Sequence, residues 1–189
     1  MSEWATSSER LFLGLLAAAV LCGIPIAAQA KVFLSRTEAL DLAFPHADRV
    51  DSQTYILSAG EAARIEKLSR SPLDSMLVEI YTGFRGGVVS GYAVIDIHNV
   101  RTLPEAFMVV LSPAGEVQSL RLLAFHEPLQ YRPTDRWYTQ FDDKSLAEPL
   151  RVGGDVHGVV GATLSARATA RGVRRVLAFY EVLIESGRE

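Results

Sequence analysis

Two hydroxyl side chains lie close together near the C-terminal end of the chain, in the segment Gly161-Ala162-Thr163-Leu164-Ser165. Its glycine and alanine let the backbone turn tightly and approach a ligand closely. An amphipathic segment follows, so we expect the Thr163 and Ser165 hydroxyls at a helix start, where free N–H groups and the helix dipole favour a phosphate. Ser165 can alternatively cap the helix. The pentapeptide therefore predicts a site for a phosphate-bearing ligand.

The pentapeptide resembles the Gly-Ala-Thr-x-Ser/Thr motif of FMN-binding domains. This family includes the flavin-carrying periplasmic subunits of sodium-pumping NADH:quinone oxidoreductase and of Rnf complexes. The resemblance covers about residues 75 to 185. It implies FMN as the cofactor, joined through a phosphoester to the Thr163 hydroxyl by a separate flavin transferase. It also implies an electron carrier rather than a stand-alone enzyme, with partner proteins in a membrane-associated redox chain.

Two positions before the pentapeptide differ from the family pattern. The family usually has Ser or Thr where this chain has Val160, and aspartate where it has His157. The nearest acid is Asp155, two residues further from the motif. Two alternatives therefore stay open: a flavin-free periplasmic interaction module of the same fold, in which Thr163 only caps the helix, and a reversible FMN-binding oxidoreductase.

Other side chains are candidates for contact with the cofactor. His126 ends a strand, where it can hydrogen-bond a flavin edge or merely cap the strand. Arg101 and Arg167 are candidate phosphate partners, and Arg167 lies on the same helix as the motif. Three aromatic residues can stack on a flavin ring or close the core beneath a loop: Tyr131, Trp137 and Tyr138.

The remaining charged groups predict solvated surfaces. Asp96 and His98 alternate along a strand, and without a third ligand nearby we expect a solvated strand face rather than a metal pair or proton relay. We expect four arginines on the solvated side of the last helix: Arg167, Arg171, Arg174 and Arg175. The sequence has no hydrolase elbow, zinc-protease motif or phosphate-cradling loop with lysine, so we assign no catalytic residues and no metal site.

The first thirty residues differ in composition from the rest. Leu11 to Ile24 is apolar, and Ala28-Gln29-Ala30 is a small-x-small cleavage signal. This pattern predicts a secretory signal peptide, or alternatively a retained membrane anchor through residues 11–30, and a periplasmic or extracytoplasmic protein. The only cysteine, Cys22, lies in this segment, and the net charge of −3 does not favour nucleic acid as a partner.

Hydrophobic periodicity and turn residues predict an α+β fold, with an antiparallel sheet flanked by helices and a long C-terminal amphipathic helix after the flavin-attachment loop. We expect an extension over residues 31–74 and the FMN-binding domain over residues 75–189. Capping boxes at Ser35 and Ser58 predict two helices. The remaining elements are strands over residues 49–57, 76–84, 88–98, 105–111 and 117–125, a short helix over 135–141, and the last helix over 165–185.

Overall fold

The structure, a computed structural model, describes residues 31–187. The predicted signal peptide or anchor of residues 1–30 lies outside the described residues. Within them, six strands form one antiparallel sheet in the order β1-β6-β5-β4-β3-β2. These strands are β1 (Lys31–Val32), β2 (Arg49–Ile56), β3 (Leu77–Arg85), β4 (Val88–Asn99), β5 (Pro104–Leu111) and β6 (Val117–Phe125).

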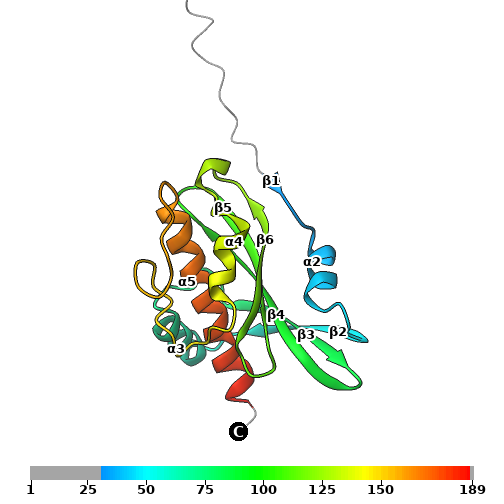
Figure 1. Cartoon of the computed structure of the whole chain (residues 1–189). Helices are drawn as coiled ribbons and strands as arrows, with labels where there is room; N and C mark the ends of the chain where they lie inside the picture. Colours follow the sequence, from blue (N-terminus) through cyan, green and yellow to red (C-terminus); the bar gives the residue numbers. More distant parts are fainter. Residues whose placement is uncertain (1–30, 188–189) are drawn as a thin grey trace, which may run out of the picture.

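Helices cover both faces of the sheet (Figure 1). Three α-helices, α3 (Ala59–Ser69), α4 (Asp135–Tyr138) and α5 (Thr163–Phe179), pack on one face, and α2 (Arg36–Ala43) packs on the other. The short 3-10 segments are η1 (Leu129–Tyr131) and η2 (Thr139–Phe141). This arrangement confirms the α+β class. Across residues 31–187, no helix combines the length and apolar character that a membrane span requires.

Local signals account for the first two helices. The Ser58 hydroxyl accepts a hydrogen bond from the Glu61 N–H at 3.3 Å, and the Glu61 carboxylate accepts from the Ser58 N–H at 2.8 Å. The same reciprocal pair joins Ser35 and Glu38 at the start of α2. Each box satisfies N–H groups that a helix start leaves without an intrahelical partner. Both predicted capping boxes are therefore confirmed.

The N-terminal extension and the rest of the chain build one sheet. Strand β2 pairs with β3 along its whole length, from Arg49 opposite Phe84 to Ile56 opposite Leu77. At the other edge, β1 pairs with the end of β6. Residues 31–74 therefore supply both edge strands of the sheet that residues 75–125 fill.

Helix α5 packs very closely on the sheet. A Cβ atom at Gly172 would lie 2.5 Å from Phe107 Cζ and 3.0 Å from Asp96 Oδ1, so only glycine fits there. Small neighbours such as Ala166 and Ala170 are also buried at this contact. The helix begins two residues before the predicted start and continues as a π-helical turn, η3 (Tyr180–Glu185), to the predicted end. This close packing fixes the position of the pentapeptide at its N-terminus.

Candidate functional site

The pentapeptide forms the turn into α5 and its first helical turn. Gly161 has φ +81°, a conformation that favours glycine, and Ala162 precedes the helix without a side-chain capping bond. The backbone N–H groups of Thr163, Leu164 and Ser165 form no hydrogen bond within residues 31–187. The helix start therefore presents three free N–H donors, the arrangement that binds anions at helix N-termini.

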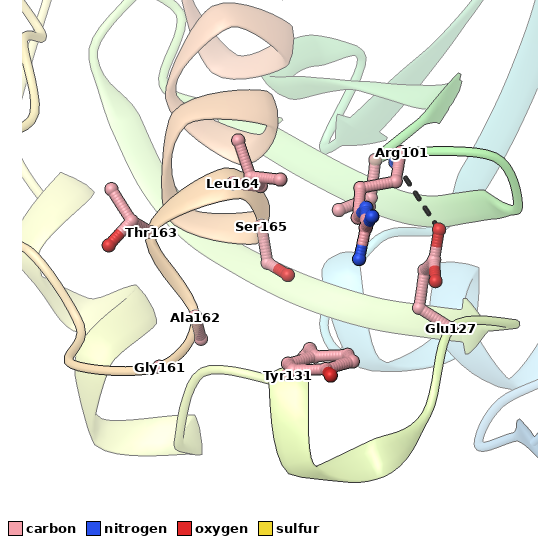
Figure 2. A pocket seen from close by; sticks show the side chains of 9 residues that line it. Arg101, Glu127, Tyr131, Gly161, Ala162, Thr163, Leu164 and Ser165 are labelled. Atoms are coloured by element: carbon pink, nitrogen blue, oxygen red, sulfur yellow. Dashed lines mark hydrogen bonds between the residues drawn. The ribbon is translucent and has the colours of Figure 1, made fainter.

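The two hydroxyls of the pentapeptide differ in exposure and direction. Thr163 is exposed, and its hydroxyl donates to the Val159 carbonyl at 3.3 Å. Ser165 is 1% exposed, and its Oγ has no partner among the described residues. Figure 2 shows the Thr163 side chain pointing away from Tyr131 and Arg101, while the Ser165 hydroxyl points toward the space between them. Of the two roles considered for Ser165, capping the helix is excluded, because Ser165 is the third residue of α5.

A cavity of about 250 Å³ lies beside the helix start. Ligand pockets for drug-sized molecules span roughly 300–1,000 Å³, so this cavity can enclose part of a flavin-sized ligand. All five residues of the pentapeptide line it. The other lining residues come from the β4–β5 connection and from the segment after β6: Val100, Arg101, Glu127 and Tyr131.

A buried carboxylate holds the loop that carries Arg101. Glu127 Oε1 accepts hydrogen bonds from the N–H groups of Arg101, Thr102 and Leu103 at 3.3, 3.0 and 3.1 Å. These bonds, led by the one from Thr102, lower the pKa of the Glu127 carboxyl. The Arg101 guanidinium is exposed, and no carboxylate in residues 31–187 lies within 4 Å of it. Glu127 thus anchors a loop whose arginine is available to an anion (Figure 2).

The aromatic candidates separate into two groups. Tyr131 lines the cavity, whereas Trp137 and Tyr138 are buried in the larger hydrophobic core. Trp137 also ties down the loop before the pentapeptide, because its Nε1–H donates to the His157 carbonyl at 2.8 Å. His126 does not line the cavity, and its backbone N–H donates to the Pro104 carbonyl at 3.1 Å.

The positions that differ from the family pattern lie on the exposed surface before the pentapeptide. Val160 is fully exposed, and His157 is exposed with its N–H and Nδ1 at 2.7 and 2.8 Å from Gln140 Oε1. Asp155 has a structural role, since its carboxylate accepts from the N–H groups of Leu150 and Arg151 at 2.9 and 2.7 Å. Neither the His157 nor the Val160 side chain lines the cavity.

The structure contains a buried cluster of charged side chains that the sequence pattern did not predict. Asp96, His98, Glu105 and Arg175 are each at least 91% buried, between β4, β5 and α5. Arg175 donates from Nε and one terminal nitrogen to both Asp96 oxygens at 2.8 and 2.7 Å. His98 lies 2.7 Å from Asp96 through Nδ1 and 3.3 Å from Glu105 through Nε2. The predicted solvated strand face at Asp96 and His98 is therefore wrong.

Two arginines of α5 are also buried, contrary to prediction. Besides Arg175, Arg174 donates to the carbonyls of Leu68 and Glu148 at 2.8 and 2.7 Å. Arg167 and Arg171 are exposed, as expected. The sequence contained a signal for this cluster. Asp96 and His98 lie on the same face of β4 as the core residues Tyr92 and Val94, because alternate residues of a strand share a face.

The cluster favours the charged forms of Asp96 and His98. Burial alone would raise the pKa of the Asp96 carboxyl, but hydrogen bonds from His98 and Arg175 keep that pKa below its ordinary value. Burial would likewise lower the pKa of His98, but Asp96 and Glu105 raise it to about 8. With His98 protonated, two cations face two carboxylates, so the buried charges balance.

Comparison with known proteins assigns no family to this site. No protein-family model matches the chain, and no curated protein matches it. The argument for a function therefore depends on the residues of the helix start and of the adjoining cavity.

Proposed function

We propose that the chain is an exported FMN-binding electron-transfer protein, with FMN attached through a phosphoester to the Thr163 hydroxyl. One observation carries the proposal: an exposed threonine hydroxyl at an uncapped helix N-terminus beside a cavity. The attachment is a transfer from FAD. Thr163 Oγ attacks the phosphorus on the riboflavin side, the phosphoanhydride bond breaks, AMP leaves, and the hydroxyl proton is lost to solvent.

The residues at the helix start fit a phosphate. The free N–H groups of Thr163, Leu164 and Ser165 and the helix dipole favour its negative charge. Arg101 adds a positive charge to the adjoining cavity, where the rest of the flavin would lie. An unpartnered buried hydroxyl such as Ser165 Oγ costs about 1–3 kcal/mol, so a polar ligand atom that reached it would stabilise the bound state.

The cavity walls are chemically suited to the ring system of a flavin. Val100, Leu164 and Tyr131 supply apolar and aromatic surface. A bound flavin supplies the redox chemistry, and the chain supplies binding, orientation and electrostatics. The same proposal includes export of the protein, attachment of the flavin by a flavin transferase, and redox partners in a membrane-associated chain.

A second candidate is a flavin-free module, or one that binds FMN reversibly. The exposed His157 and Val160 favour it, because a transferase that needs an aspartate and a hydroxyl at these positions would not recognise the loop. Denaturing gel electrophoresis separates the candidates, because only covalent flavin keeps its fluorescence with the denatured band.

The direct test is the intact mass of the protein exported from a host that co-expresses a flavin transferase. We expect an increase of one FMN less one water in the wild type, and none in Thr163→Ala. Thr134→Ala is a matched control, because Thr134 is also exposed and precedes a helix without a side-chain capping bond. If the mass does not increase in the wild type, the second candidate replaces covalent attachment.

A further inference from the structure

A second cavity, of about 430 Å³, lies next to the first along α5. Residues 98–99 of β4 and positions 168, 171 and 175 of α5 line it, whereas residues 100–101 and 161–165 line the first cavity. The α3–β3 connection closes its far side, and α3 lies beside α5 in Figure 1. The lining residues are Arg70, Ser71, Pro72, Asp74, His98, Asn99, Ala168, Arg171 and Arg175.

Guanidinium groups dominate the charge of this second cavity. Arg70 and Arg171 are exposed, and neither lies within 4 Å of a carboxylate in the part of the chain that the structure describes. The guanidinium of Arg175 is the third in the cavity lining, and its ion pair with Asp96 fixes its position. The lining includes one exposed acid, Asp74, while the charge of Asp96 is already paired with Arg175.

The wall beneath these arginines is rigid. Arg175 is held by two hydrogen bonds to Asp96, and its remaining terminal nitrogen lies 3.3 Å from the Ser71 hydroxyl. His98, packed edge-on against Phe107, completes the buried side. A fixed polar wall beside two exposed cations lowers the cost of ordering an anionic ligand.

We propose that this second cavity binds the oxyanion group, phosphate or carboxylate, of a small molecule. Guanidinium groups recognise both anions through paired N–H donors. Arg171 and Arg70 supply the attracting charge, and the Arg175 wall supplies fixed polar surface. The cavity exceeds the first in volume, so it has room for a molecule that carries the anion rather than for the bare ion alone.

Binding at this cavity does not require a flavin, so its test uses the flavin-free Thr163→Ala protein. Isothermal titration calorimetry with inorganic phosphate and with succinate, against chloride at equal ionic strength, should show saturable binding of at least one oxyanion. Phosphate alone would identify phosphate esters as the ligand class, succinate alone would identify carboxylates, and both would identify a general oxyanion site.

Paired variants separate a site from general charge attraction. Arg171→Ala should weaken binding about tenfold, the effect of losing one charge-assisted contact. Arg136→Ala removes an exposed arginine that lines neither this cavity nor the first, and should leave binding unchanged. The absence of saturable binding, or an equal loss in both variants, would overturn the proposal and would leave the question of the flavin unaffected.

Discussion

Thr163 and Ser165, two residues apart in the first turn of α5, present their hydroxyls to opposite environments. The Thr163 hydroxyl is exposed and donates to Val159 at 3.3 Å, whereas Ser165 Oγ is buried without a partner among the described residues. A modifying enzyme can reach the first hydroxyl, and a ligand inside the cavity can contact the second. This division predicts different effects for their removal.

Ser165→Ala should leave covalent flavin on Thr163 but change the stability gained from it. In the flavin-free protein, removing an unsatisfied buried hydroxyl should be neutral or stabilising by up to about 1 kcal/mol. In the flavin-loaded protein, the variant should lose stabilisation relative to the wild type. Urea unfolding of both forms measures this, and an equal effect in the two forms would show that Ser165 does not contact the flavin.

Arg101→Gln should lower the midpoint potential of the bound flavin. Removing a positive charge from the cavity disfavours the added electrons, by an amount on the order of tens of millivolts at a screened site. Redox titration of the loaded protein measures the potential. Arg136→Gln, which removes an exposed arginine that does not line this cavity, is the control and should not shift it. An unchanged potential in Arg101→Gln would place the flavin away from Arg101.

The correctly predicted features are local in sequence. Ser58 and Glu61 lie three residues apart and define a helix start wherever the chain folds. The Arg175–Asp96 pair spans 79 residues, and it depends on the close approach of α5 to β4 at Gly172. Arg174 and Arg175 were expected on the solvated side because a helical stripe indicates one buried face, whereas α3 and neighbouring loops cover the other sides of α5.

The candidate site was predictable as a motif but not as a cavity. The pentapeptide identified the helix start, but the sequence left open whether Ser165 caps the helix or faces a ligand. Glu127 was missed as an anchor, because its partners at Arg101 to Leu103 come from a connection more than twenty residues away.

Arg175→Ala should destabilise the protein strongly. It leaves the buried Asp96 carboxylate without its bidentate partner, and breaking such a pair costs about 3–5 kcal/mol. Arg171→Ala is the control, because its exposed side chain forms no ion pair within residues 31–187 and should change stability little. Urea denaturation compares them, and equal midpoints would contradict a structural role for the pair.

Stability should fall above neutral pH because of His98. Its folded-state pKa of about 8 lies above the ordinary value of 6.5. The stabilisation is therefore fully present below about pH 6.5 and is lost as the pH rises through 8, amounting to about 2 kcal/mol. The free energy of unfolding should fall more between about pH 6 and pH 9 in the wild type than in His98→Gln. Parallel pH profiles would contradict this assignment.

The most direct test of the central claim is the mass of the tryptic peptide over residues 152–167, which contains Thr163 and Ser165. The protein is exported with a flavin transferase, and fragmentation of the peptide assigns the modified residue. We predict an added mass of one FMN less one water, on Thr163. An unmodified peptide, or flavin on any other residue, would contradict the account.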